Sequence, residues 1–290
     1  MLDAEKPDVF CFVTQPNVRL PLVELGLRHG VRAIAFEKPM ATSLAEARRI
    51  RDLCDAAGVK FIVSHQQKYG RHWHEARETA RRGEIGDVVR IHACSRAWLA
   101  QLGTHLVDYV LWFNGGCRAT WVVGHVHGRK GLTDSHPSPD FVLGEIAFEN
   151  GVRAFVEFGY LSPQRLADNK FWTDNTITLH GTHGYAWATT DGEWRAFTRL
   201  SGGEVVGAQL DFWPAQENSL LQAPYLRDLA DWLDDESKAH PCNGDISYHG
   251  FEIMTGLCLS ALDHRRIDLP LGEVPREPVI ERLARELPER

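Results

Sequence analysis

Near its start the chain alternates short apolar segments with helix-forming segments, and this order constrains the fold more than any other feature. The apolar segments are rich in β-branched and aromatic residues, as buried strands are, and cover residues 8–14, 31–36 and 59–64. Between them, residues 21–29 and 43–57 place apolar side chains at helical spacing and stop at Gly30 and Gly58. Strands and helices in this order, with short connections, predict a parallel sheet.

Two local signals sharpen this prediction. Ser43-Leu44-Ala45-Glu46 fits the capping box that opens a helix, in which a hydroxyl and a carboxylate cover free amides reciprocally. Parallel sheets bind ligands beyond the carboxyl ends of their strands. We therefore expect a ligand near the segments that follow the three strands, which are residues 14–17, 37–39 and 64–69.

After about residue 70 the pattern changes to many strands separated by turn residues. The expected strands are residues 88–95, 120–128, 141–149, 152–161 and 175–181 with the run 185–194, and the expected helices are residues 73–82, 105–114, 225–235 and 250–265. This pattern predicts a large, mostly antiparallel open sheet. The fold class is thus α/β followed by α+β, with a partial Rossmann-type domain over residues 1–69 and a second domain over residues 70–290.

Charge and composition exclude several classes of protein. The net charge of −7 argues against a nucleic-acid partner, which calls for a basic surplus. The chain holds no apolar run long enough to cross a membrane, and its first residues are charged where an export signal is apolar. Six cysteines without a C-x-x-C pair indicate reduced thiols, so we expect a cytoplasmic protein.

Three residues carry candidate chemistry. Lys38 ends a predicted parallel strand, where its ammonium can stabilise negative charge on a bound oxygen; the alternative is a solvated turn lysine. His105 opens a helix and can exchange a proton near neutral pH, unless it only packs between domains. Asp108 lies on the same helix face and can orient the imidazole or bind a substrate hydroxyl.

Other candidates are weaker. A group of histidines and aspartates matches no firm metal-ligand spacing, so no metal is expected at His125, His127, Asp134, His136 and Asp140. Among nine tryptophans, mostly expected in the core, Trp98 is a candidate for stacking against a sugar ring. The G-x-G-x-x-G turn that holds a dinucleotide's pyrophosphate is missing.

Several motifs occur in the order and spacing of a known family. They are VTQPN, FEKPMATSLAEA, VSHQQKY, RRGEIGDVVRIH, GTHLVDYVLWFNGG, HGTHGYAWA and SALDHRRIDLPL, and they extend over essentially the whole chain. With these motifs the chain resembles the Gfo/Idh/MocA family, named for glucose–fructose oxidoreductase and inositol dehydrogenase. Members of that family combine a Rossmann domain with an open-sheet domain and use NAD or NADP to oxidise or reduce sugars and cyclitols.

The resemblance implies roles for particular residues. Lys38 would bond the reacting hydroxyl, His105 would be the general base in oxidation and the general acid in reduction, and Asp108 would contact substrate or fix the histidine. The implied cofactor-binding set is Thr14, Pro16, Asn17, Glu37, Lys38, Pro39 and Gln66. Lys68 stands at the family's arginine position and joins Trp98 and Asp108 as a substrate-binding candidate.

The sequence departs from the family at several places. Gln101 replaces an aspartate, so it can hold a hydroxyl but cannot share a proton, and we count it among the catalytic candidates with Lys38 and His105. Leu20 replaces a common histidine, and residues 95–103 are shorter than usual. Met1 falls where the family's Rossmann domain is already half complete, which predicts an N-terminally shortened chain and puts NAD or NADP binding in question.

These observations lead to one expected function and two alternatives. The expected function is NAD(P)-dependent hydride transfer on a sugar, sugar acid or cyclitol. The alternatives are NAD-assisted glycoside cleavage, as in some relatives, and a non-catalytic protein without cofactor. Because an open sheet exposes a wide apolar face, we also expect a homodimer or tetramer formed through the C-terminal sheet.

Overall fold

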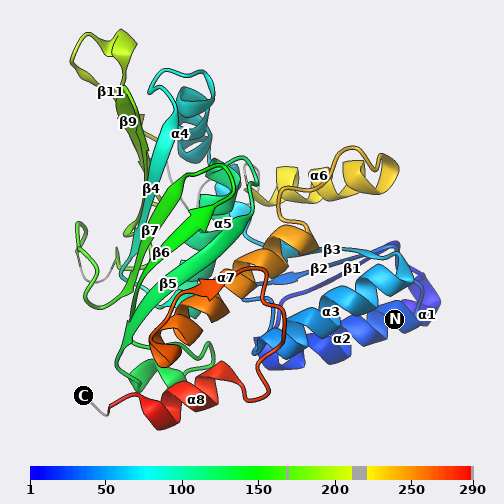
Figure 1. Ribbon diagram of the computed structural model, residues 1–290. Helices are drawn as coiled ribbons and strands as arrows, with labels where there is room; N and C mark the ends of the chain where they lie inside the picture. Colours follow the sequence, from blue (N-terminus) through cyan, green and yellow to red (C-terminus); the bar gives the residue numbers. More distant parts are fainter. Residues whose placement is uncertain (168–169, 211–220, 289–290) are drawn as a thin grey trace.

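The computed structural model describes residues 1–167, 170–210 and 221–288, and it contains two sheets (Figure 1). The first sheet has three parallel strands in the order β1 (Val9–Phe12), β2 (Ala33–Glu37) and β3 (Lys60–Ser64). Phe12 lies beside Phe36, and Phe36 beside Val63, so all three strands end at one edge.

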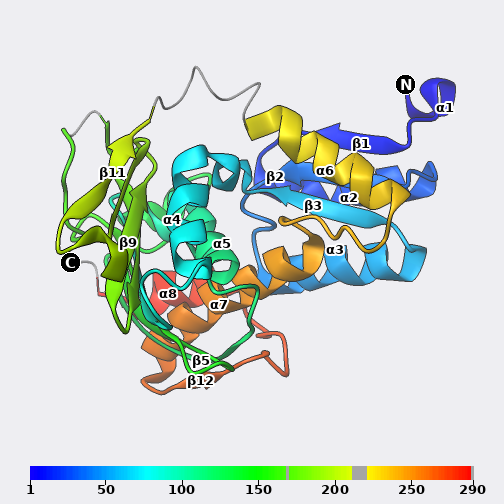
Figure 2. The ribbon, with the colours of Figure 1, turned by 90° about the horizontal axis from the view of Figure 1, so that it is seen from above.

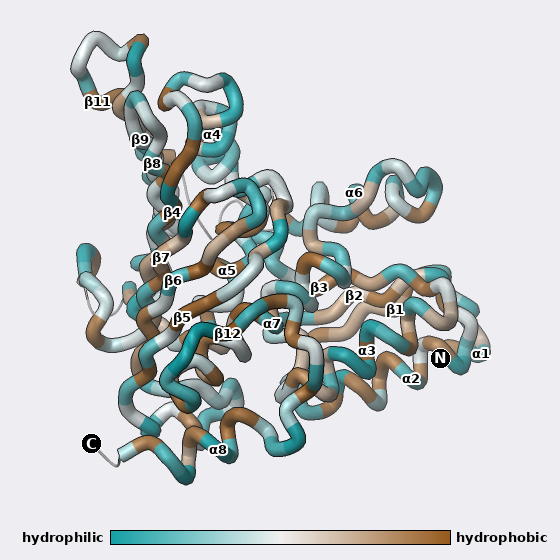
Figure 3. The backbone as a smooth tube through the Cα atoms, viewed as in Figure 1, coloured by the Kyte–Doolittle hydropathy of each residue, from teal (hydrophilic) through white to brown (hydrophobic). Residues whose placement is uncertain are grey.

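Helices from both halves of the chain cover this sheet. On one face, α2 (Arg19–Arg28) and α3 (Leu44–Ala57) bury its phenylalanines, after the short α1 (Leu2–Glu5). On the other face lies α6 (Ala223–Asp234), whose Tyr225 and Leu229 pack on the sheet (Figure 2). In Figure 3 hydrophobic and hydrophilic residues alternate along α2 and α3, as expected for helices with one buried face.

The start of α3 follows the predicted capping pattern in part. The Ser43 hydroxyl accepts a hydrogen bond from the Glu46 amide at 3.2 Å, as expected. The Glu46 carboxylate, however, accepts from the amide and hydroxyl of Thr42, at 2.9 and 2.7 Å, and not from the Ser43 amide. The hydrogen bond from the backbone to the Glu46 carboxylate thus comes from Thr42, one residue before the expected Ser43. It connects the segment after β2 to the start of the helix.

The second sheet has nine strands in the order β11-β10-β9-β8-β4-β7-β6-β5-β12. Their bounds are β4 Val88–Ser95, β5 Ala119–His127, β6 Phe141–Phe148, β7 Arg153–Gly159, β8 Asn175–Gly181, β9 Gly184–Thr189, β10 Glu193–Phe197, β11 Val205–Gln209 and β12 Ile267–Asp268. All neighbours are antiparallel except β4 and β7, so the predicted large, mostly antiparallel sheet is confirmed.

Helices cover one face of the large sheet. They are α4 (Arg71–Arg81), α5 (Thr104–Phe113) and α7 (Gly244–Asp263), with α8 (Val279–Glu286) packed against α7. Figure 2 shows them between the two sheets, while no described helix lies on the opposite face of the large sheet. None of the helices in the described ranges has the length and apolar character that crossing a bilayer requires.

A close backbone approach fixes α7 on β5. Gly124 donates its amide to the Ser260 hydroxyl at 3.0 Å, and a Cβ at Gly124 would overlap the Leu257 carbonyl group. Gly124→Ala is therefore expected to lower the free energy of unfolding by about 1–3 kcal/mol, because the helix must move off the strand. Urea denaturation measures the change. Gly272→Ala is the matched control, since its Cβ meets nothing within 4 Å; equal losses in both variants would contradict the argument.

Candidate active site

Lys38 projects from the carboxyl end of the first sheet toward the turn that follows β4 of the large sheet. It follows β2 directly, and the Lys38–Pro39 peptide bond is cis. Its Nζ donates to the carbonyl oxygen of Gln101 at 2.9 Å. Gln101 belongs to the π-helical turn Leu99–Gly103 that leads into α5, so this hydrogen bond joins the strand end to the start of the helix that carries His105.

A buried arginine supports this strand end from below. Arg19, at the start of α2, has no exposed surface, and its Nη2 donates to the carbonyl oxygens of Thr14 and Lys38, both at 2.9 Å. Burial lowers the pKa of Arg19 to about 10, although Glu37 and Glu46 oppose the shift. Arg19 therefore clamps the carboxyl ends of β1 and β2 together and adds positive charge beneath Lys38.

His105 is the second residue of α5 and is only 4% exposed. The hydroxyl of Tyr109, one helical turn later, lies 3.3 Å from His105 Nδ1. The ring of His65, from the segment after β3, meets the His105 ring edge-on with centroids 5.2 Å apart. His65 Nε2 in turn lies 3.1 Å from the Thr104 hydroxyl, so a histidine that follows β3 and a histidine of α5 share one buried space.

Asp108 faces inward, away from open solvent. It forms an ion pair with the Lys68 ammonium, and its Oδ1 lies 3.5 Å from His65 Nδ1. Lys68 also donates to the Pro241 carbonyl oxygen at 3.0 Å, and both members of the pair are 1% exposed. The structure thus brings the predicted substrate-binding residues Lys68 and Asp108 together as an internal ion pair under His105.

The charges around His105 are mostly positive. Burial, followed by His65, Lys38 and Lys68, places the pKa of His105 well below its ordinary value. Burial also lowers the pKa of Lys38, against the attraction of Glu37. His105 is therefore a neutral imidazole at neutral pH, and Lys38 is an ammonium that gives up its proton more readily than an exposed lysine.

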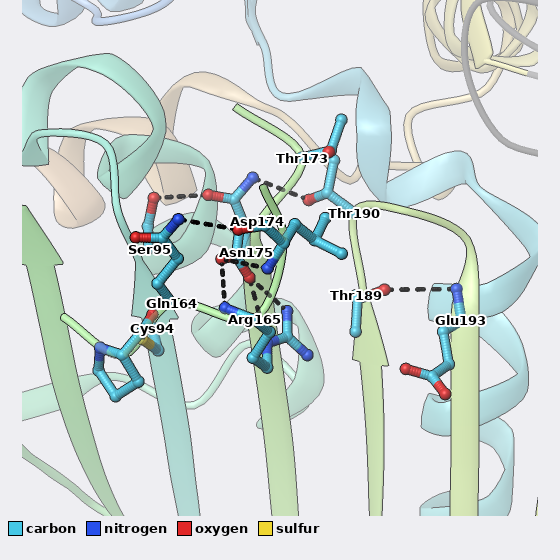
Figure 4. Close-up of polar contacts among 12 residues, drawn as sticks. Cys94, Ser95, Gln164, Arg165, Thr173, Asp174, Asn175, Thr189, Thr190 and Glu193 are labelled. Atoms are coloured by element: carbon cyan, nitrogen blue, oxygen red, sulfur yellow. Dashed lines mark hydrogen bonds and ion pairs between the residues drawn. The ribbon is translucent and has the colours of Figure 1, made fainter. Parts of the chain in front are cut away.

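A polar network in the large sheet fixes the turn that carries Gln101. The Ser95 hydroxyl, at the end of β4, donates to Asn175 Oδ1 at 2.5 Å and accepts from the Ala97 amide at 3.0 Å. Asn175 Nδ2 donates to the Thr190 hydroxyl at 3.1 Å, so β4, β8 and the end of β9 are joined (Figure 4). This network sets the direction in which the chain leaves β4 toward residues 99–103.

The neighbouring carboxylate of Asp174 holds the loop beside this network. It is 1% exposed and accepts from Arg165 Nε and Nη2 at 3.2 and 3.0 Å, as Figure 4 shows. The backbone amides of Arg165 and Leu166 donate to the same carboxylate at 2.7 and 3.1 Å. Four donors on one buried carboxylate make this corner of the sheet rigid.

The remaining predicted site residues lie around the same strand ends. Thr14 and Glu37 are half-buried, Pro16 and Pro39 are buried, and Asn17 is exposed. Gln66 is buried, and its Oε1 accepts from the Ser64 hydroxyl at 2.8 Å. Trp98 is half-buried and lies over Gly131, whose Cβ position is 3.1 Å from the indole ring. The roles assigned to these residues stay predictions.

A pocket of about 120 Å³ opens beside Lys38, next to Pro39 and Ala100. The loop before β6 forms one of its walls and contributes Ser138, which is 1% exposed. His136, from the same loop, has its pKa lowered by burial and by the nearby Lys38. The wall of this pocket is mostly apolar, and His136 directly precedes the residues Pro137 and Ser138 that line it.

The histidines and aspartates noted in the sequence do not converge. The Tyr160 hydroxyl lies 2.8 Å from His127 Nδ1, and the Asp140 carboxylate accepts from the Lys130 and Gly131 amides. Asp134 accepts from the His136 amide at 2.8 Å. Within residues 1–167, 170–210 and 221–288, no group of three potential ligands is arranged to hold a metal ion.

The strand ends fit one part of a nicotinamide dinucleotide. Thr14 Oγ1 is buried without a hydrogen-bond partner in the described part of the chain, and Lys38 has donors to spare beside it. These groups suit the nicotinamide and its ribose. The glycines of residues 1–65 are Gly26, Gly30 and Gly58, which lie within or after helices, so these residues supply no pyrophosphate-binding turn.

Sequence reasoning missed four residues of this site: Arg19, His65, Tyr109 and His136. Tyr109 could have been predicted from its spacing, because residues four apart share a helix face and His105 was already a candidate. Arg19 and His65 gave no signal, since their importance comes from burial between elements distant in sequence. His136 was considered only as a metal ligand, and its position near Lys38 depends on the fold of its loop.

Comparisons with known proteins agree with this arrangement. Residues 1–65 match the family model GFO_IDH_MocA, described as an oxidoreductase family with an NAD-binding Rossmann fold. An uncharacterized oxidoreductase of Streptococcus pneumoniae is 28% identical over 204 residues, which are 63% of this chain and 53% of that protein. The aligned region thus spans about half the length of that relative.

Solved structures extend the similarity to nearly the whole chain. An oxidoreductase domain protein from Kribbella flavida has a TM-score of 0.74 at 15% identity, covering 93% of this chain and 82% of that one. The aldose-aldose oxidoreductase of Caulobacter crescentus has a TM-score of 0.73 at 18% identity, covering 92% and 81%. An inositol dehydrogenase homolog from Azotobacter vinelandii, crystallised with NADH and myo-inositol, has a TM-score of 0.69 at 14% identity, covering 90% and 78%.

These similarities agree with the family resemblance of the sequence motifs, and the two-sheet architecture agrees with the fold of the solved structures. The family model accounts for the strands β1, β2 and β3, and the solved structures account for the second sheet. Residues 1–65 thus match the Gfo/Idh/MocA model of NAD-binding oxidoreductases, and the chain as a whole has the fold of the solved oxidoreductases to which it is similar.

Proposed function

We propose that this protein is an NAD(P)-dependent oxidoreductase that interconverts a hydroxyl and a carbonyl group on a sugar, sugar acid or cyclitol. The observation that carries the proposal is the meeting of Lys38, from the cofactor-binding sheet, with the helix start that holds His105. Relatives of the same fold include an aldose-aldose oxidoreductase and an inositol dehydrogenase homolog, which supports a polyhydroxylated substrate.

The residues of this chain would bind and polarise the reacting oxygen. When bound, the nicotinamide supplies or accepts the hydride. Lys38 and His105 flank the place where that oxygen would lie, and one of them must exchange a proton with it. Thr14 Oγ1 would bond the nicotinamide ribose, because it is buried without another partner among the described residues. The prolines around the pocket would exclude water.

Binding of NADH to the 290-residue chain tests the cofactor part of this proposal. We expect micromolar affinity in a calorimetric titration, with NADPH titrated in parallel to find the preferred dinucleotide. If neither NADH nor NADPH binds, and the protein isolated from its native source gives the same result, the proposal is contradicted and a non-catalytic protein is favoured.

Product analysis tests the reaction. Incubation of the protein with a panel of aldoses, sugar acids and cyclitols and with NAD or NADP is expected to form reduced cofactor together with a carbonyl product. Sugar release from glycosides without net formation of NADH would point instead to the NAD-assisted cleavage considered above.

We also propose a cytoplasmic homodimer or tetramer that buries the uncovered face of the large sheet. Leu143 on β6 and Phe155 on β7 are 39% and 37% exposed on that face. Covering such side chains is a common reason for self-association. Sedimentation equilibrium at micromolar concentration checks this, and a monomer there would contradict it.

A further inference from the structure

The two nitrogens of His105 have different surroundings. Nδ1 faces the hydroxyl of Tyr109 at 3.3 Å. In the described part of the chain no hydrogen bond reaches Nε2, so that nitrogen is available to a ligand. Which nitrogen carries the proton is decided by the partner of the other one. Tyr109 therefore controls what His105 presents to the reacting oxygen.

Tyr109 is placed as a donor to Nδ1. Its hydroxyl is fully buried, and a buried hydroxyl needs an acceptor for its hydrogen. His105 Nδ1 is the one acceptor that the described residues offer to its hydrogen. A nitrogen that accepts carries no hydrogen, so in the neutral ring the hydrogen is on Nε2.

The charges around the ring oppose a second proton. Lys38 faces His105 from the end of β2, His65 from the end of β3, and Lys68 from the turn Gln66–Tyr69. Asp108, on α5 itself, carries a carboxylate, but it is already paired with the Lys68 ammonium. The ring also lies at the N-terminus of α5, where the helix dipole disfavours a cation. Protonation at Nδ1 would in addition leave the Tyr109 hydrogen without an acceptor.

We propose that Tyr109 is a positioning residue that holds His105 as the neutral Nε2–H tautomer, so that His105 donates a hydrogen bond to the substrate oxygen and Lys38 exchanges the proton. This inference rests on the proposed function and refines it, because the family resemblance implied that His105 is the general base in oxidation and the general acid in reduction. A neutral imidazole with a lowered pKa that polarises a carbonyl oxygen is an established catalytic arrangement.

In the direction of reduction, the carbonyl carbon would gain a C–H bond from the hydride that a bound reduced nicotinamide dinucleotide would supply. The C=O π electrons move to the oxygen, where the Nε2–H of His105 stabilises the developing charge. The oxygen takes a proton from the Lys38 ammonium, which becomes an amine and is reprotonated from solvent, since Lys38 is only half-buried. His105 ends with the proton it had at the start.

Nitrogen-15 NMR of histidine-labelled protein tests the tautomer without any substrate or activity. We expect a pyridine-type signal at Nδ1 and a pyrrole-type signal at Nε2 of His105 near neutral pH, assigned by their loss in the His105→Gln variant. Tyr109→Phe keeps the ring that packs on Trp73 but removes the hydroxyl, and it should shift His105 toward the other tautomer. A pyrrole-type Nδ1 in the unmodified protein, or an unchanged tautomer in Tyr109→Phe, would overturn the proposal.

The activity of His105 variants shows whether His105 acts as a hydrogen-bond donor or as a base that exchanges the proton. Glutamine places an amide N–H near the position of Nε2 but cannot take up a proton, whereas asparagine ends near Nδ1 and alanine has no donor. We expect His105→Gln to stay within about tenfold of the unmodified kcat, and His105→Asn and His105→Ala to lose about 10²-fold or more. Equal losses in all three would show that His105 itself exchanges the proton, even where the tautomer is as proposed. If the unmodified protein is inactive but shows the expected Nε2–H tautomer, that result would contradict the proposed function and leave the assignment of the tautomer standing.

Discussion

Lys38→Met is expected to lower kcat by about 10³-fold at saturating NADH. The reason is that the Lys38 ammonium, at the carboxyl end of β2, contacts the turn that leads to His105, and in the proposed function it would supply both charge and proton to the reacting oxygen. Methionine keeps the length of the side chain, so packing around Pro39 is retained. Single-turnover oxidation of NADH with the substrate found in the panel measures the effect.

Lys60→Met is the matched control for this experiment. Lys60 lies at the opposite end of the same sheet, at the start of β3, where it pairs with the exposed Glu236 at 2.9 Å. We expect kcat of this variant to stay within twofold of the unmodified value. A loss of activity in Lys60→Met comparable to that in Lys38→Met, or full activity in Lys38→Met, would contradict the role given to Lys38.

Asp108→Ala is expected to lower the free energy of unfolding by about 3–5 kcal/mol. The substitution leaves the Lys68 ammonium buried without its counter-charge, and an uncompensated buried charge is among the costliest defects in a folded protein. Urea denaturation at neutral pH measures the loss. Lys68→Met combined with Asp108→Leu removes both charges and should recover most of the stability, which distinguishes the lost pairing from lost packing.

An exposed pair on α4 provides the comparison. Arg71 Nε lies 3.2 Å from Glu75 Oε1, with the Arg71 side chain 73% exposed, so Glu75→Ala should change stability by about 0.5 kcal/mol or less. A small effect of Asp108→Ala, similar to that of Glu75→Ala, would mean that water or a rearranged side chain compensates Lys68.

The pH dependence of the Asp108→Ala effect follows from the pKa of the carboxyl. Burial would raise the pKa of Asp108, but Lys68 and His65 hold it below its ordinary value. A lowered carboxyl pKa stabilises the folded state above the pKa of the unfolded chain, and this stabilisation is lost as pH falls through the folded-state pKa. The difference between Asp108→Ala and the unmodified protein should therefore shrink in acid.

The first sheet was predictable because local signals agree with its final structure. The apolar segments around Ile34 and Ile62 are buried on both faces of the sheet, and the helix stops at Gly30 and Gly58 fall where expected. Family motifs then led to Lys38 and His105, and the fold joins Lys38 by a hydrogen bond to Gln101, four residues before His105. The strands, helix ends and motif residues of the first sheet can be predicted from short stretches of sequence, because they depend little on long-range contacts.

The rest of the site depends on contacts between residues that lie far apart in the sequence. The partner of Asp108 is Lys68, forty residues earlier, and nothing in either segment indicates that they are buried together. The second face of the first sheet is covered by α6. In the sequence this helix is an ordinary amphipathic segment near residue 225, and nothing in it indicates that it packs on the first sheet. β11, β12 and α8 were not expected, because their short segments have weak patterns.

The position of α6 affects how the chain is made. β3 is complete at Ser64, but the helix that covers Ala33, Ala35 and Ile62 begins only at Ala223. At about 5–20 residues per second, the ribosome needs roughly 10–30 s to add the intervening chain. During that interval the nascent sheet exposes its aliphatic face, so we expect the growing polypeptide to be a client of ribosome-associated chaperones until α6 has emerged from the exit tunnel.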